Sequence, residues 1–159
     1  MAYFKNLNKY INETVLKLIA NQNLCKLLKF NSNNPYAEID IMDTGELIYS
    51  KIFPYSHVPE TDKEVGSYLC IILDRFRLTS NQAIKSGQLN IDIIVHNDLW
   101  RMNGTGEMRP YAIMHEVDEA LNGKIRVGIK DLTFSDCRHV RYNQSYSGFQ
   151  LTYSIQSVN

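Results

Sequence analysis

Two apolar stretches, YLCIILDRF (residues 68–76) and QLNIDIIVH (residues 88–96), decide the fold of this chain. The first is apolar on both faces, which is typical of a strand that is covered on both sides. In the second, apolar residues alternate with more polar ones from Leu89 onward, which predicts a strand with one buried and one mixed face. We expect the two strands to pair as a β-hairpin over residues 68–96, with a long polar connector at residues 77–88.

Upstream of this hairpin, apolar side chains recur at spacings of three and four. They are Phe4, Leu7, Ile11, Val15 and Leu18. This period predicts an amphipathic helix over residues 4–20. A second short helix is expected at residues 23–30. Residues 31–67 read as an irregular arm, because a turn cluster opens it and Pro54 and Pro59 interrupt it. The arm has room for a short strand within residues 46–53.

Downstream, a third helix is predicted over residues 110–122. Pro110 suits the first turn of a helix, and Asn122-Gly123 is a stop signal. A C-terminal β-hairpin is expected over residues 127–158. Its first strand would span residues 127–136 with a bulge near Lys130, and its last strand shows a clear alternation of apolar and polar residues.

This order of elements predicts one domain over residues 1–159 with an α+β fold. We expect a mostly antiparallel β-sheet packed against two main α-helices and closed by a terminal β-hairpin. A chain of 159 residues can bury a core of its own.

The charge balance argues against a protein that grips nucleic acid. Lys plus Arg and Asp plus Glu each number 17, so the formal net charge is zero. Affinity for nucleic acid depends largely on neutralising phosphates, and this chain has no basic excess to do so. The three cysteines are scattered along the chain. They predict neither a disulfide framework nor a metal knuckle, and Cys70 reads as a buried free thiol in a protein made in a reducing cytosol. The sequence predicts no signal peptide and no membrane span.

The motifs that carry catalysis are incomplete here. His115-Glu116 opens like a zinc-binding helix but lacks the second histidine one turn later. The loop Gly104-Thr105-Gly106 lies between a strand and a helix, yet Glu107 occupies the place of a phosphate. The acidic residues Asp92, Asp98, Glu116 and Glu119 have no evident pairing. We therefore expect no catalytic site, no metal and no cofactor.

Basic and aromatic residues gather at two places in the sequence. Arg75 and Arg77 flank Phe76, and Arg138 and Arg141 precede Tyr142 and Tyr146. Such groups either contact other proteins, where Arg and Tyr are enriched, or stack on single-stranded bases. The zero net charge favours protein contacts.

Taken in order, the elements resemble the tail-terminator and tail-completion proteins of long-tailed bacteriophages, which form small rings in the phage neck. The resemblance covers most of the chain and rests on the order and patterning of the elements. Its parts are the opening helix at 4–20, IFPYSHVPE at 52–60, the strands at 68–76 and 88–96, RPYAIMHEVDEALNG at 109–123 and YSGFQLTYSI at 146–155.

The resemblance implies a structural virion protein and not an enzyme. Such a protein is made in the host cytoplasm and forms a homo-oligomeric ring, usually a hexamer, that caps the tail tube and joins the tail to the head. Its partners would be its own copies, the tail tube protein and a head-side neck protein, with DNA only passing through the lumen. We expect the contacts with other subunits or the tube to come from the 77–88 connector and the 138–148 hairpin. The residues to test are Arg75, Arg77, Lys85, Arg138, Arg141, Tyr142 and Tyr146.

Three alternatives stay open at this point. The first is a different neck ring, such as a head-tail connector or stopper. The second is a small nucleic-acid-binding module that uses the Arg–Tyr hairpin. The third is a small enzyme that uses His96 or His115 with scattered carboxylates.

Overall fold

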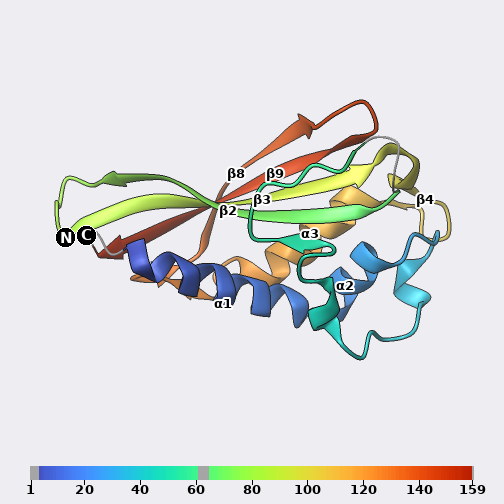
Figure 1. Cartoon of the computed structure of the whole chain (residues 1–159), viewed down its shortest axis with the longest axis horizontal. Coiled ribbons are helices and arrows are strands. Elements are labelled where there is room, and N and C mark those ends of the chain that lie inside the picture. Colours follow the sequence, from blue (N-terminus) through green and yellow to red (C-terminus); the bar gives the residue numbers. More distant parts are fainter. Residues whose placement is uncertain (1–3, 61–64, 159) are drawn as a thin grey trace.

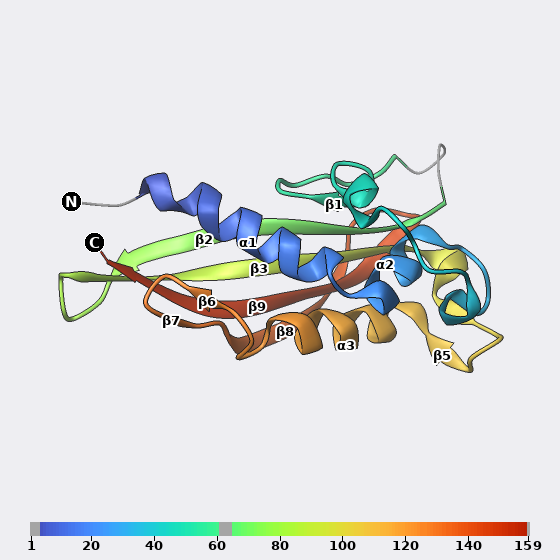
Figure 2. The same ribbon diagram turned by 90° about the horizontal axis from the view of Figure 1, so that it is seen from below.

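A long twisted β-sheet forms one layer of the molecule and helices form the other (Figure 1). The computed structural model describes residues 4–60 and 65–158, and within these ranges it has three α-helices, α1 (Leu7–Ile19), α2 (Gln22–Lys29) and α3 (Arg109–Leu121). All three lie on the same side of the sheet (Figures 1 and 2). The fold is α+β, as the sequence predicts.

The main sheet has five strands in the described residues, in the order β1-β2-β3-β9-β8. Each neighbouring pair is antiparallel except β1 and β2, which run parallel. The strands are β1 (Ile52–Phe53), β2 (Ser67–Leu78), β3 (Ile84–His96), β8 (Thr133–Arg141) and β9 (Tyr146–Val158). The three central strands have 12 or 13 residues each. At about 3.3 Å per residue they reach roughly 40 Å, which gives the molecule its elongated shape.

Short elements fill the connections. They are 3-10 helices at Phe4–Asn6, Pro35–Ala37, Thr44–Leu47 and Asn97–Leu99, and two small ribbons, β4 (Arg101–Met102) with β5 (Glu107–Met108) and β6 (Arg126–Val127) with β7 (Lys130–Asp131). The arm expected at residues 31–67 is mostly irregular in its described part, and its residues 61–64 lie outside the described residues. It holds two of the 3-10 helices and the two-residue strand β1.

The hairpin expected over residues 68–96 is present as β2 and β3, but the long connector is wrong. The strands continue to Leu78 and resume at Ile84, so the loop between them is only residues 79–83. Residues 84–88 look polar in sequence because alternate side chains, such as Ser86 and Gln88, lie on a side of the sheet that carries no helix. A polar side chain is no barrier to a strand when its face is open to solvent.

The strand expected at residues 127–136 is also wrong as a single element. The chain turns back at Gly128, which has a φ of +75°, and forms the β6–β7 ribbon before β8 begins at Thr133. A Cβ atom at Gly128 would lie 1.9 Å from the Gln156 carbonyl oxygen, so the turn needs a glycine. The terminal hairpin itself is formed by β8 and β9.

The apolar core lies between the sheet and the helices. Leu89, Ile91, Ile93 and Val95 of β3 are fully buried, as the alternation predicts. The helices oppose them with buried residues from each amphipathic stripe. These include Val15 and Leu18 of α1, Leu24 and Leu27 of α2, and Ile113, Val117 and Leu121 of α3. We call this helix-covered side of the sheet the covered face.

Arg109, the first residue of α3, is buried within this layer and only 1% exposed. Its guanidinium donates hydrogen bonds to four backbone carbonyls. They belong to Leu27 (2.6 Å), Phe30 (2.9 Å), Ser32 (2.8 Å) and Leu99 (3.3 Å). Two of these carbonyls lie at the C-terminal end of α2, where the helix dipole favours a positive charge. Arg109 thus joins the start of α3 to the end of α2, and burial lowers its pKa to about 10.

Candidate functional site

The side of the sheet that carries no helix is the candidate functional site (Figure 1). We call it the open face. It is formed by the alternate residues of the same strands that build the covered face. On β3 these are Ser86, Gln88, Asn90, Asp92 and Ile94, and on β9 they are Gln150, Thr152, Ser154 and Gln156.

One end of the open face is closed by an aromatic cluster. Its buried members are Phe53, Tyr68, Cys70, Ile94 and Tyr146, with Tyr142 packed against them. The His57 ring stacks on Phe53 with 4.2 Å between the ring centroids. The arm is therefore folded over this end of the sheet.

Cys70 fastens the arm to the sheet inside the aromatic cluster. Its Sγ accepts a hydrogen bond from the His57 N–H and donates one to the His57 carbonyl. Burial raises the pKa of this thiol to about 11, so it stays protonated at neutral pH. The prediction that Cys70 is a buried free thiol is confirmed.

The remainder of the open face forms a polar groove. Two adjoining cavities of about 450 and 300 Å³ share Arg75, Gln88 and Ser135 in their linings. The floor consists of amide and hydroxyl side chains from β3 and β9. Some of them bond across the strands, since the Thr152 hydroxyl lies 3.0 Å from the Asn90 amide oxygen and the Gln150 amide donates to Asp92 at 2.8 Å.

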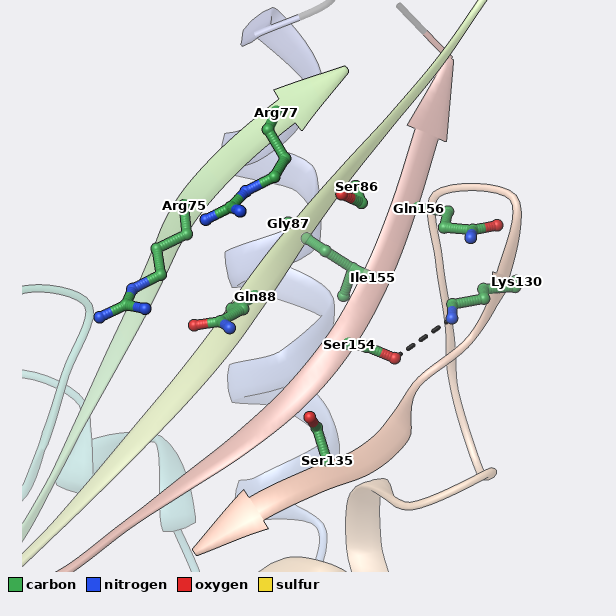
Figure 3. Close-up of a pocket in the computed structure, with 10 residues that line it drawn as sticks. All are labelled: Arg75, Arg77, Ser86, Gly87, Gln88, Lys130, Ser135, Ser154, Ile155 and Gln156. Carbon is green, nitrogen blue, oxygen red and sulfur yellow. Dashed lines mark hydrogen bonds between the residues drawn. The ribbon is translucent and has the colours of Figure 1, made fainter. Parts of the chain in front are cut away.

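Basic side chains stand on both walls of the groove (Figure 3). On β2 the register slips between Asp74 and Arg77, and Arg75 in this bulge has a φ of +55°. The bulge places Arg75 and Arg77 on the same wall. On the opposite wall Lys130 donates to the Ser154 hydroxyl at 3.1 Å, and Arg138 donates to the Gln150 amide oxygen at 3.1 Å.

Asp92 is the most buried acidic group on the floor and is 8% exposed. Burial raises its pKa above the ordinary value of 3.8, while the Gln150 hydrogen bond and the nearby Arg138 charge act in the opposite direction. Burial also raises the pKa of the neighbouring Tyr142 hydroxyl, and the Asp92 charge adds to that effect. The carboxyl group is therefore held by hydrogen bonding and by Arg138, without a direct ion pair among the described residues.

The residues singled out from the sequence do not all come together in the structure. Arg75, Arg77 and Arg138 come together at the groove. Lys85 does not, because it is only 6% exposed and its ammonium lies 4.2 Å from the centroid of the Phe4 ring, on the covered face. Arg141 lies outside the groove, where its Nε donates to the Asn143 carbonyl.

The two tyrosines of the predicted contact set belong to the aromatic cluster. Tyr146 is fully buried and leaves no surface for a partner, whereas Tyr142 is half-buried and its hydroxyl donates to the Phe149 carbonyl at 3.4 Å. The sequence pattern cannot show this, because a tyrosine beside arginines looks the same whether it faces solvent or packs inside.

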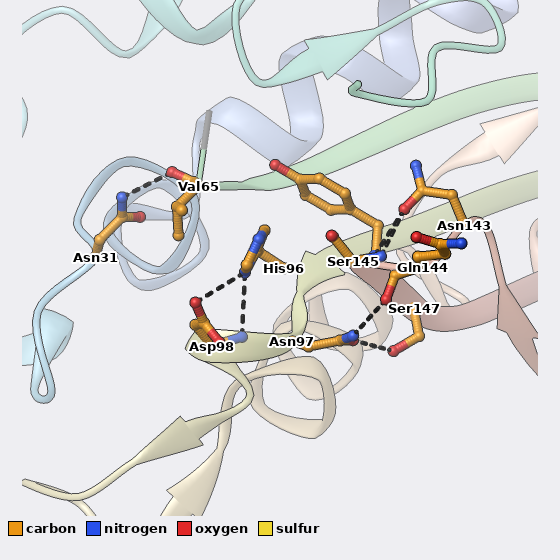
Figure 4. A network of polar contacts seen from close by, with 10 residues as sticks. Asn31, Val65, His96, Asn97, Asp98, Asn143, Gln144, Ser145 and Ser147 are labelled. Carbon is orange, nitrogen blue, oxygen red and sulfur yellow. Dashed lines mark hydrogen bonds and ion pairs between the residues drawn. The ribbon is translucent and has the colours of Figure 1, made fainter. Parts of the chain in front are cut away.

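The turn between β8 and β9 is fastened to the end of β3 and does not protrude freely (Figure 4). Asn97 donates from its amide to the Gln144 carbonyl, and its amide oxygen accepts from the Ser147 hydroxyl. Asn143 accepts from the backbone N–H groups of Ser145 and Tyr146. The tip of the expected 138–148 hairpin is thus hydrogen-bonded to the residue that follows β3.

The histidines considered for catalysis are placed apart. His96 uses Nδ1 to accept from the Asp98 N–H, and His115 lies on the exposed side of α3. Within the described parts of the chain, no three His, Cys, Asp or Glu side chains gather in a way that could hold a metal ion. The expectation of a non-enzymatic protein stays a prediction.

Sequence reasoning missed the floor of the groove and Lys130. The signal was present as two polar alternations, at residues 86–92 and 150–156. Only the pairing of Gln88 with Ser154 and of Asn90 with Thr152 shows that the two alternations share one face.

Comparison with known proteins gives a family for this chain. No curated protein matches it. No helix among the described residues is long and apolar enough to cross a membrane. The sequence model of the YomW family matches residues 21–155, which include every strand of the main sheet except the last part of β9. The chain therefore belongs to the YomW family, a family of phage-derived proteins.

Proposed function

We propose that this protein is a structural component of the phage neck, a tail-terminator ring that caps the tail tube and joins the tail to the head. The phage-derived family supports a role in a phage particle. The observation that carries the proposal is the pair of open strand edges on opposite sides of one sheet. In such a sheet, one edge can pair with a strand of the next copy and the opposite edge can pair with a strand of the previous copy.

The first open edge belongs to β8. It is the last strand in the sheet order, and no strand in the described residues pairs with its outer side. The Tyr142 N–H donates inward to the Tyr146 carbonyl. Because hydrogen-bonded and non-hydrogen-bonded pairs alternate in an antiparallel ladder, the N–H groups of Cys137, His139 and Arg141 point outward. They are the groups that an incoming strand would meet.

The second open edge belongs to β2. The strand β1 pairs only with Leu69 and Cys70, so the described structure leaves β2 unpaired from Ile71 onward on that side. Both edges contain a bulge, at Arg75 in β2 and at Ser135 in β8. Bulges limit indiscriminate pairing of sheet edges, while the regular stretch at residues 136–141 stays available for one specific partner.

Pairing β8 of one copy with β2 of the next would be a heterologous contact. Repeated contacts of this type form a closed ring when the rotation between copies fits a whole number of subunits. The zero net charge lowers the repulsion between copies. A ring closed in this way satisfies both edges and has none left for another copy, which explains how it could end the growth of a tube.

Light scattering on the purified protein tests the ring and its edge together. We expect a closed oligomer near six times the chain mass of 18.4 kDa. His139→Pro removes an outward N–H and should give a monomer, because proline is tolerated at an edge but cannot donate to a new strand. His139→Ala is the matched control. It also removes the imidazole side chain but keeps the backbone N–H, so it should assemble normally.

The capping role is tested by mixing the protein with the tail tube protein of the same phage and measuring tube length by electron microscopy. Wild-type protein should bind tube ends and stop elongation, and His139→Pro should not. A wild-type protein that stays monomeric at every concentration, even with tube protein present, contradicts the proposal. If the protein binds the head-side neck protein and does not bind the tube, its role is that of a stopper and not of a terminator.

A further inference from the structure

We infer that the polar groove on the open face binds an extended, acidic segment of a partner protein. This goes beyond the ring proposal, because it assigns a ligand to the sheet face, whereas ring closure uses the sheet edges. The charges of the walls, the chemistry of the floor and the width of the groove each favour such a ligand.

The end of the groove nearest the β2–β3 loop is positively charged. Arg75 and Arg77 stand on one wall and Lys130 on the other, and none of the described residues that line this end is a carboxylate (Figure 3). Both arginines are exposed, and neither forms an ion pair within residues 4–60 and 65–158. Three cations around one polar floor favour a ligand with carboxylates, which arginine can bind through two parallel hydrogen bonds.

The backbone at Arg75 strengthens this reading. Its φ of +55° lies in the left-handed region that favours glycine, yet the chain carries the longest basic side chain there. The Arg75 side chain lines the groove together with that of Arg77. A strained backbone that holds a charged side chain at the wall of a groove points to a ligand for that charge.

The floor offers hydrogen bonds that are not used internally. The side chains of Ser86, Gln88 and Gln156 have no hydrogen-bond partner among the described residues, and each is half-buried. Hydroxyl and amide groups both donate and accept, so they match the alternating N–H and C=O groups of an extended backbone. The floor thus suits a peptide that lies along the strands.

The width of the groove indicates a single chain. Its walls are β2 on one side and β8 with β7 on the other, with β3 and β9 between them. Three strand spacings amount to about 14 Å, enough for one extended chain with its side chains.

A nucleic-acid strand fits the same groove poorly. Within residues 4–60 and 65–158 no aromatic residue lines either cavity, so this part of the chain gives bases nothing to stack on. Farther along, Asp74 and Asp136 line the groove together with Arg138, so a continuous row of phosphates would meet negative charge. The favoured ligand is a peptide with two or three acidic residues over the Arg75 end and neutral polar residues beyond it.

Fluorescence anisotropy with a labelled ten-residue peptide that carries three Glu residues at one end and Ser and Gln in the remainder tests the inference. A Gln-Ser peptide and an oligothymidylate of equal charge are the comparison ligands. We expect the acidic peptide to bind, the Gln-Ser peptide not to bind, and the affinity to fall with added salt. Arg75→Gln/Arg77→Gln should weaken binding about tenfold, which is the loss of roughly 1.4 kcal/mol.

Lys17→Gln/Arg101→Gln is the matched control. It removes the same charge from exposed residues of α1 and β4 and should change the affinity less than about twofold. Three results would overturn the inference. They are no binding of the acidic peptide, an equal loss in the control variant, or tighter binding of the oligonucleotide than of the peptide. Light scattering on the groove variant separates the two proposals, because its oligomeric mass should match that of the wild type.

Discussion

The covered face and the open face of the sheet are built from alternate residues of the same strands. They differ in what packs against them, since helices cover only the first. On β3, Ile91 is fully buried against the helices, whereas its neighbour Asn90 touches Thr152 of the next strand and borders a groove. The covered face must be apolar and closely packed because it forms the core. The open face needs only to avoid unpaired buried groups, so its residues are free to serve binding. Four predictions test how far this difference extends.

The largest effect is expected from the layer that covers the sheet. Arg109→Met keeps a long side chain but removes the donors that four backbone carbonyls use. We expect a loss of about 3 kcal/mol or more in the free energy of unfolding, measured by urea denaturation. Arg101→Met, at an exposed arginine of β4, should change it by less than about 0.5 kcal/mol. Similar values for the two variants would show that Arg109 does not hold α2 and α3 together.

A direct comparison of the two faces uses two positions on β3. Ile91→Ala on the covered face leaves a cavity in the core and should cost about 3 kcal/mol. Gln88→Ala on the open face removes a side chain with no internal hydrogen bond and should cost less than about 0.5 kcal/mol. Equal losses in urea denaturation would mean that the open face is covered in solution, for instance by a second copy.

The third prediction concerns the buried carboxyl group of the open face. Burial raises the pKa of Asp92 in the folded state above its value in the unfolded chain. A raised pKa means that the folded state binds the proton more tightly, so this group favours folding below the unfolded pKa. That contribution is lost as the pH rises through the folded pKa.

Asp92→Asn should therefore be more stable than the wild type at pH 7, by an amount on the order of 1 kcal/mol. The difference should shrink toward pH 3, since both side chains are then neutral. Thermal unfolding at several pH values measures it. An Asn variant that is less stable at pH 7 would show that the Arg138 charge and the Gln150 hydrogen bond outweigh burial.

The smallest effect on stability comes from the strained residue of the groove wall. Arg75→Gly relieves a positive φ at an exposed position and should raise the free energy of unfolding by up to about 1 kcal/mol. The same variant should bind the acidic peptide more weakly than the wild type. A gain in stability together with a loss of binding would identify Arg75 as a residue kept for binding. A loss of both would make it a structural residue of the bulge.

Much of the fold could be predicted because its elements carry strong local patterns. The helical period at residues 4–20 and the alternations at 88–96 and 146–155 each fix which side chains face the core. The predictions of a connector at residues 77–88 and of a single strand at residues 127–136 were wrong for the same reason. Polar residues on an open face and a glycine at a tight turn both read as loop or bulge when the neighbouring strand is unknown.

The candidate site was only partly predictable. Arg75, Arg77 and Arg138 were chosen for their charge and aromatic neighbours, and the sheet brings them to one groove. Lys85 and Tyr146 were chosen by the same rule and are buried elsewhere. Charge and residue type are properties of the chain, but exposure is a property of what packs against it.

The sequence by itself determined the α+β class, the hairpin of the two central strands, the amphipathic helices and the neutral charge. These follow from local periodicity and composition, which need no knowledge of distant residues. The tertiary structure alone decided that Arg109 lies inside the helical layer, that β1 pairs parallel with β2, and that polar positions of β3 and β9 form one floor. Each of these depends on contacts between segments far apart in the chain, where register and packing, and not local preference, set the free energy.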